Sequence, residues 1–117
     1  MKKIFSLLII CLLITGCGEK SYETIDTNKA IELIDSGSVI LDVRTKEEYD
    51  KQHITNAINI PLDQIDTIDL DKNTSIIVYC ASGVRSQNAV EKLAEMGYTS
   101  LYNLDGGLIN WGGSLEE

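Results

Sequence analysis

The chain has 117 residues and a formal net charge of −8, which is enough for one compact domain but not for two. An acidic chain is repelled by a phosphate backbone, so we expect no nucleic-acid partner. No cluster of His, Cys, Asp and Glu has the spacing of a metal site, so we expect no bound metal. We also expect the protein to be a monomer.

The first segment has the layout of a bacterial export signal. Lys2 and Lys3 form a basic head, an apolar run extends over 4–14, and small residues lead to Cys17. The run is too short for an ordinary membrane span. Its ending "ITGC" resembles the bacterial lipobox, in which the cysteine is acylated and becomes the mature N-terminus. A plain secretory signal, or an uncleaved anchor with an incidental cysteine, is the alternative.

We therefore predict a lipoprotein signal peptide over 1–16, and an acylated N-terminus with a short linker over 17–21. The four linker residues after Cys17 span roughly 13 Å when extended, so the domain should lie close to the lipid bilayer. Cleavage removes two lysines and no acid, which takes the net charge from −8 to −10. Acyl chains such as palmitate, and not a basic patch, must then hold the protein at the extracytoplasmic face of the cell membrane.

Short strand-like and helical runs alternate along the rest of the chain. Apolar runs predict strands over 22–25, 38–43, 57–60, 75–79 and 100–104. Helical patterns lie between them, over 27–36, 45–50, 61–65 and 85–96, and a glycine turn follows the last strand. This alternation predicts an α/β fold with a mainly parallel five-stranded sheet and helices on both faces. The domain is predicted over 22–112, with a short C-terminal tail over 113–117.

The first helical pattern predicts its own cap and buried face. Thr27 or Asn28 is the expected N-cap, and Ala30, Ile31 and Ile34 recur at helical spacing. We therefore expect these three apolar side chains to pack on the sheet.

Thr45 stands three residues before Glu48, which is the spacing of a capping box at the start of a short helix. Pro61 suits the first turn of the next short helix.

The stretch "YCASGVRS" places the one unassigned cysteine, Cys80, at the end of the most apolar strand. Reactive groups of a parallel sheet collect beyond the carboxyl ends of its strands. Gly83 permits a tight loop whose backbone N–H groups point inward, and a helix begins near Arg85 or Ser86. These donors and the helix dipole should hold Cys80 as a thiolate. The alternative is a small buried hydrophobic residue.

Four segments together resemble the rhodanese family in the family's order. They are "CASGVRS" (80–86), "LDVRTKEEY" (41–49), "HITNAINIP" (53–61) and "NLDGGLINW" (103–111). The resemblance implies a rhodanese-like fold and a single-domain sulfurtransferase without a cofactor. Cys80 would take sulfane sulfur from thiosulfate or a similar anion as a persulfide and pass it to cyanide or a thiol. The loop residues would surround that sulfur mainly with backbone N–H groups: Ala81, Ser82, Gly83, Val84 and Arg85.

Two alternatives remain beside this one. Cys80 could serve a persulfide carrier or a redox-sensing interaction module without fast turnover. A phosphatase or arsenate reductase is disfavoured, because those enzymes resemble one another in having five residues between cysteine and arginine, and four stand here.

Three more polar residues lie in the matching segments. The resemblance gives Asp42 and Arg44 a structural role as a partly buried ion pair, which we prefer to a catalytic acid and an anion clamp. His53 is more consistent with fixing a turn than with acting as a general base, because a thiolate needs no base. The family usually has glycine where this chain has Gln52 and Asn56, and Asn56 is the best substitute for a left-handed conformation.

Overall fold

The computed structural model describes residues 21–117; the predicted signal peptide and Cys17 lie outside them. Five strands form one sheet in the order β1-β6-β5-β2-β4, and every pairing in it is parallel. The strands are β1 (Glu23–Ile25), β2 (Val39–Asp42), β4 (Ile58–Asn59), β5 (Ser75–Tyr79) and β6 (Ser100–Leu104). The five strands predicted from the sequence are thus confirmed, with β4 shorter than expected.

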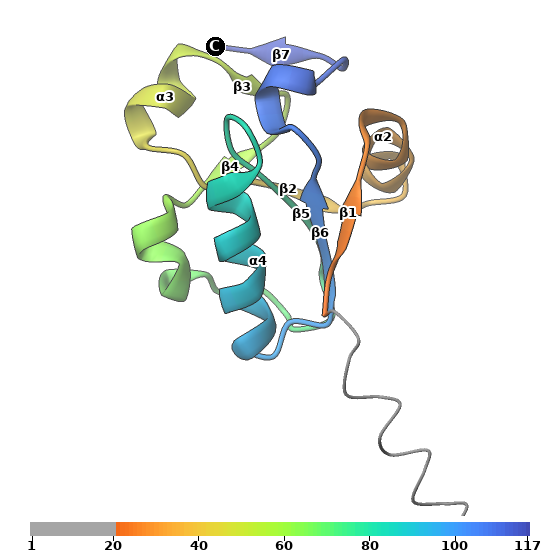
Figure 1. Cartoon of the computed structure of the whole chain (residues 1–117), viewed down its shortest axis with the longest axis vertical. Coiled ribbons are helices and arrows are strands. Elements are labelled where there is room, and N and C mark those ends of the chain that lie inside the picture. The colour runs from red at the N-terminus through yellow and green to blue at the C-terminus, as the bar shows by residue number, and fades with distance from the viewer. Residues whose placement is uncertain (1–20) are drawn as a thin grey trace, which may run out of the picture.

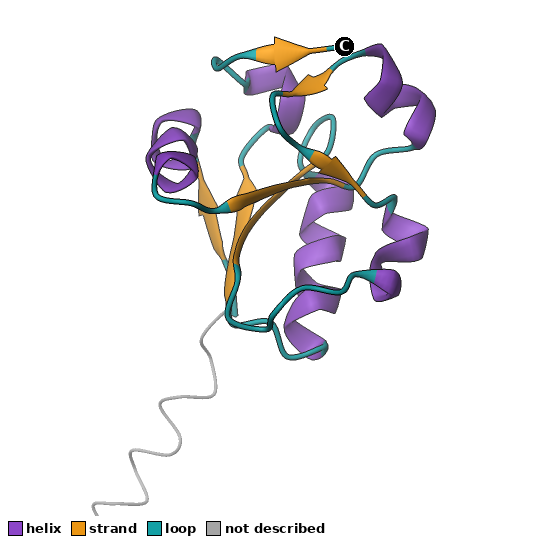
Figure 2. Cartoon of the chain, turned by 180° about the vertical axis from the view of Figure 1, so that it is seen from behind, coloured by secondary structure: helices purple, strands orange, loops and turns teal. Residues whose placement is uncertain are grey.

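Helices cover both faces of this sheet, as predicted (Figure 1). Helix α2 (Thr27–Asp35) lies on one face, and helix α4 (Val84–Glu95) and the 3-10 helix η3 (Leu62–Thr67) lie on the other. The remaining elements gather beyond the carboxyl ends of the strands (Figures 1 and 2). They are helix α3 (Lys46–Lys51), the 3-10 helix η4 (Gly107–Asn110), and the antiparallel pair of β3 (His53–Ile54) and β7 (Leu115–Glu116).

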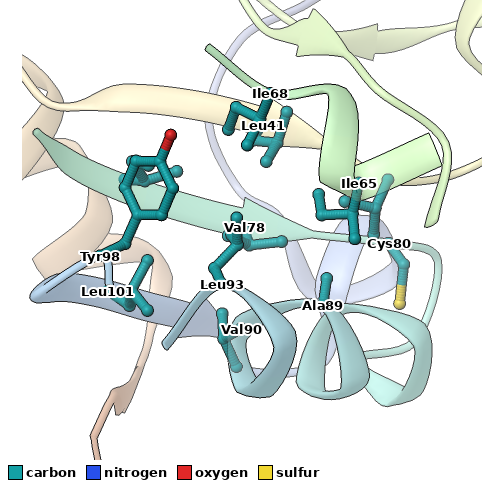
Figure 3. Packing of buried hydrophobic residues seen from close by; sticks show 12 residues of the cluster. Leu41, Ile65, Ile68, Val78, Cys80, Ala89, Val90, Leu93, Tyr98 and Leu101 are labelled. Atoms are coloured by element: carbon teal, nitrogen blue, oxygen red, sulfur yellow. The ribbon is translucent and has the colours of Figure 1, made fainter. Parts of the chain in front are cut away.

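The alternation of side chains along β5 explains the two-sided core. Ile76, Val78 and Cys80 belong to the buried cluster with α4 and η3, whereas Ile77 and Tyr79 belong to the cluster on the face of α2. All five side chains are essentially buried, because helices cover both faces of a parallel sheet. Figure 3 shows the first cluster, with the sulfur of Cys80 beside helix α4. Because side chains alternate between the two faces of the sheet, the Cys80 side chain points toward α4.

Two details of α2 differ from the predictions. The N-cap is Asp26 and not Thr27 or Asn28, and its carboxylate accepts a backbone hydrogen bond of 2.9 Å from the first turn. Ile31 is 37% exposed, and Leu33 packs against the core in its place. Ala30 is buried and Ile34 packs against the core as predicted, so the buried face of α2 runs through Ala30, Leu33 and Ile34.

The capping box of α3 is confirmed. The backbone N–H of Glu48 donates to the Thr45 hydroxyl at 3.2 Å, and the Glu48 carboxylate accepts from the Thr45 N–H at 3.0 Å. Asn56 has a φ of 69°, in the left-handed region predicted for it. Gln52 has a φ of −171°, an extended conformation that needs no glycine. Neither departure from the family pattern therefore disturbs the local backbone.

Residues 113–117, predicted as a short tail, contain strand β7. Its Leu115 and Glu116 pair with Ile54 and His53 of β3. Two-residue strands about sixty positions apart leave no sequence pattern, and the pair was not predicted. No helix within residues 21–117 is long and apolar enough to cross a membrane.

Candidate active site

The loop after β5 folds around the sulfur of Cys80. Gly83 has a φ of 106°, a value that favours glycine, and is the N-cap of α4. The Cys80 Sγ accepts hydrogen bonds from the backbone N–H groups of Gly83 at 3.1 Å and Ser86 at 3.4 Å. The predicted cradle of backbone donors is thus present at the start of a helix, where the dipole also favours negative charge.

A buried polar chain continues from the sulfur. The Cys80 Sγ lies 3.5 Å from the Ser86 hydroxyl, which donates to the Asn103 side-chain oxygen at 2.6 Å. All three residues are buried. A hydroxyl carries one proton, so while Ser86 donates to Asn103 it accepts from the thiol, and it can turn toward the sulfur once the thiol ionises. Neither the contact of Ser86 with the sulfur nor the role of Asn103 is predicted from the sequence.

These contacts shift the ionisation of the thiol. Burial raises the pKa of Cys80, but hydrogen bonds from Ser86, Gly83 and Ser82 outweigh it, and the pKa falls below the ordinary cysteine value. The site therefore favours the thiolate at lower pH than a free cysteine does.

The glycine turn after β6 holds the cysteine loop in place. The backbone N–H of Leu108 donates to the Cys80 carbonyl at 2.8 Å, and that of Ile109 donates to the Ala81 carbonyl at 3.1 Å. Gly107 approaches so closely that an added Cβ would collide with the Cys80 carbonyl oxygen and lie 2.8 Å from the Ala81 carbonyl carbon. The sequence predicts this turn but not its contact with the loop. The two adjacent glycines were the only signal of such a close approach.

Arg85 is bound to an acid of another element. Its Nη1 and Nη2 atoms contact the two carboxylate oxygens of Glu48 at 2.9 and 3.1 Å. Because Arg85 holds it, the pKa of Glu48 falls to about 2. The arginine also interacts electrostatically with Cys80. The sequence predicts only a capping role for Glu48, because no pattern links positions 37 residues apart.

The other predicted loop residues are more exposed than Cys80. Ala81 and Gly83 are half-buried, Ser82 is exposed, and the Val84 side chain is 67% exposed. Ile109 of η4 is 75% exposed. Since its backbone N–H donates to the Ala81 carbonyl, Ile109 lies beside the loop.

Asp42 and Arg44 form a buried ion pair, the arrangement expected for a structural role. The Arg44 Nη2 lies 2.7 Å from the Asp42 carboxylate, and both residues are at most 5% exposed. Tyr79 donates its hydroxyl proton to the same carboxylate at 2.6 Å and accepts from the Ile54 N–H at 3.0 Å. Arg44 also donates to the Gln52 carbonyl at 2.7 Å. This network ties β2 and β5 to the segment around β3.

His53 lies in that segment, 7% exposed. Its Nδ1 lies 2.8 Å from the Tyr49 carbonyl oxygen, and its ring stacks on the Tyr49 ring with centroids 3.7 Å apart. Its Nε2 is 3.6 Å from the Glu116 carboxylate. These contacts join α3, β3 and β7 and give the histidine the surroundings of a turn-fixing residue.

A cavity of about 630 Å³ adjoins Arg85. Its lining comes from the ends of β2 and α3, from η3 and from α4: Val43, Thr45, Pro61, Leu62, Asp63, Arg85, Asn88, Glu91, Lys92 and Glu95. No group of three or more possible metal ligands occurs among residues 21–117.

The fold and the site together define an α/β protein with a single thiolate-stabilising loop at the head of a helix. The rhodanese-like domain model matches residues 26–114, and the chain belongs to that family.

Known relatives and structures agree with this assignment. The chain is 31% identical over 93 residues to thiosulfate sulfurtransferase GlpE of Coxiella burnetii, covering 77% of this chain and 87% of that protein. It is 46% identical over 70 residues to thiosulfate sulfurtransferase PspE of Escherichia coli, covering 56% of this chain and 67% of that protein. A rhodanese-like domain protein of Staphylococcus aureus superposes with a TM-score of 0.72 and 36% identity, covering 80% of this chain and 96% of that one.

One relative is much longer. An adenylyltransferase and sulfurtransferase of Ogataea parapolymorpha is 35% identical over 102 residues, which is 81% of this chain but only 26% of that protein.

Proposed function

We propose that this protein is a sulfurtransferase that carries sulfane sulfur as a persulfide on Cys80. The observation that supports it most is the pair of backbone N–H groups on the Cys80 Sγ, at 3.1 and 3.4 Å, at the start of α4. Such donors stabilise a thiolate before attack and the outer sulfur of a persulfide after it.

The reaction needs only the groups of the donor and of Cys80. The thiolate attacks the sulfane sulfur of thiosulfate, a new S–S bond forms, and the old S–S bond breaks with its electron pair leaving on sulfite. Cyanide or a thiolate then attacks the outer sulfur of the persulfide, and the Cys80 thiolate is regenerated. No metal or organic cofactor enters either step. The relatives from Coxiella burnetii and Escherichia coli are thiosulfate sulfurtransferases, which supports thiosulfate as a donor.

Steady-state turnover tests this proposal. We expect the purified protein to release thiocyanate from thiosulfate and cyanide, and Cys80→Ser to release none. Wild-type activity in Cys80→Ser would refute the role of this cysteine.

A persulfide carrier or redox-sensing module without fast turnover is the second candidate. The burial of Cys80, which is 1% exposed, favours this alternative, because a small acceptor reaches a buried sulfur slowly unless a partner protein exposes it. A persulfide on Cys80 that discharges only to a protein thiol, and not to cyanide, would support this alternative.

We also propose a lipid anchor at Cys17 that keeps the domain at the extracytoplasmic face of the membrane. The basic head, the apolar run and the lipobox-like ending support it. Cys17→Ala should release the protein from membranes or stop its processing, as judged by fractionation and metabolic labelling with palmitate. Fully processed, membrane-bound Cys17→Ala protein would contradict acylation there.

A further inference from the structure

The loop around Cys80 has one basic side chain, and that side chain is already neutralised. Arg85 is the sole charged residue over 80–86. Both of its terminal nitrogens contact Glu48, one on each carboxylate oxygen. This two-point geometry is the strongest that an arginine forms with a carboxylate.

Glu48 is fixed for this contact from its own side. It is the N3 residue of α3, and its Oε1 also accepts from the Thr45 N–H and hydroxyl at 3.0 and 3.1 Å. With a pKa of about 2, it stays ionised at every pH at which a sulfur donor would be tested. The charge of Arg85 is therefore balanced throughout that range.

The charged side chains near Arg85 do not make this part of the site positive. The cavity beside Arg85 carries three carboxylates, from Asp63, Glu91 and Glu95, against one ammonium, from Lys92. The side chains around Arg85 thus carry a net negative charge, which repels a doubly charged anion near Arg85 about twice as strongly as a singly charged one.

We infer that Glu48 sets the donor preference of this site, and that the preferred sulfur donor carries at most one negative charge. The class is that of organic persulfides and thiosulfonates, in preference to the thiosulfate dianion. This inference rests on the proposed sulfurtransferase function and concerns only which donors the site accepts.

The transfer from such a donor balances. With a thiosulfonate, the Cys80 thiolate attacks the terminal sulfur, and the bond from that sulfur to the sulfonyl sulfur breaks. The electron pair of that bond leaves on the sulfinate, and Cys80 carries the persulfide anion. With an organic persulfide, the leaving group is a thiolate. Neither reaction needs an outside oxidant or reductant.

The test compares thiosulfate with methanethiosulfonate, which carries one charge less, in wild type and in Glu48→Gln. Glutamine keeps the capping box, so α3 should stay formed while the charge is lost. We expect kcat/KM to rise about tenfold for thiosulfate and about threefold for methanethiosulfonate, because the effect of one removed charge scales with donor charge. Glu47→Gln, which removes the same charge from an exposed position of the same turn, should change both by less than about twofold.

In an Arg85→Gln background Glu48 is an unbalanced carboxylate, so Glu48→Gln should again raise the ratio of kcat/KM for thiosulfate to kcat/KM for methanethiosulfonate, by a similar factor. A ratio that stays unchanged in that background would contradict a direct charge effect of Glu48. If the ratio of kcat/KM for thiosulfate to kcat/KM for methanethiosulfonate were equal in wild type, Glu48→Gln and Glu47→Gln, the inference would be overturned. Only the capping role of Glu48 would then remain.

A second measurement does not depend on turnover. Cys80 can be alkylated with anionic iodoacetate and with neutral iodoacetamide, and the reaction followed on the Cys80 peptide by mass spectrometry. The ratio of the two rates reports the electrostatic potential near the Cys80 sulfur. Glu48→Gln should raise the iodoacetate-to-iodoacetamide rate ratio about threefold. An unchanged ratio would overturn the inference. If neither donor loads wild type while this ratio still rises, the proposed sulfurtransferase function fails but the charge effect of Glu48 stands.

Discussion

The contact between Gly107 and the cysteine loop leads to the sharpest prediction for stability. At a φ of 56° an alanine costs about 1 kcal/mol, and its Cβ would also collide with the Cys80 carbonyl oxygen. The colliding atoms are backbone atoms of the Cys80 loop, which cannot rotate away as a side chain can. Overpacking therefore adds about 1–3 kcal/mol to the cost of the alanine. We therefore expect Gly107→Ala to lower the free energy of unfolding by about 2–4 kcal/mol and to displace the loop.

Gly37→Ala provides the control. Gly37 also has a positive φ, of 105°, but an added Cβ meets nothing within 4 Å. Backbone strain alone should cost about 1–2 kcal/mol there and leave the site untouched.

Urea unfolding and persulfide loading measure the two effects. Gly107→Ala should unfold at lower urea than Gly37→Ala, lose about 10 °C or more in Tm relative to wild type, and load Cys80 poorly. If Gly107→Ala matched Gly37→Ala in stability and loaded Cys80 at the wild-type rate, the reasoning about this close approach would be refuted.

Two further predictions concern the buried polar groups. Tyr79→Phe removes the hydroxyl between the Asp42 carboxylate and the Ile54 N–H, and should lower the free energy of unfolding by about 1–3 kcal/mol in urea titrations without changing the thiolate pKa. Ser86→Ala removes a contact that lowers the pKa of Cys80, so the pKa should rise and alkylation at pH 7 should slow about three- to tenfold. An unshifted pH profile of alkylation in Ser86→Ala would show that the backbone donors suffice.

Much of the site could be predicted because it is local in sequence. The loop of Cys80 and Gly83, the helix start after it and the capping box of Thr45 each lie within a few residues. The left-handed Asn56 was predicted in the same way, from the conformational preference of one residue type.

What escaped prediction depends on contacts between distant segments. Glu48 meets Arg85, and Gly107 meets Cys80, only after the sheet brings the ends of different strands to one edge. The antiparallel pair of β3 and β7 is of the same kind, because strands of two residues carry no periodicity. At Gln52 the family pattern predicts a need for glycine that the structure does not have. The backbone there is extended, a conformation that any residue adopts.

The most direct test of the central claim is the mass of the protein after brief exposure to a sulfane-sulfur donor and removal of the excess. Reduced wild type and Cys80→Ser should be treated side by side with thiosulfate and with methanethiosulfonate. We predict that wild type gains one sulfur atom, located on the Cys80 peptide, and that cyanide removes it as thiocyanate. If neither donor adds sulfur to wild type, or if Cys80→Ser gains as much as wild type, the assignment of Cys80 as the sulfur carrier is contradicted.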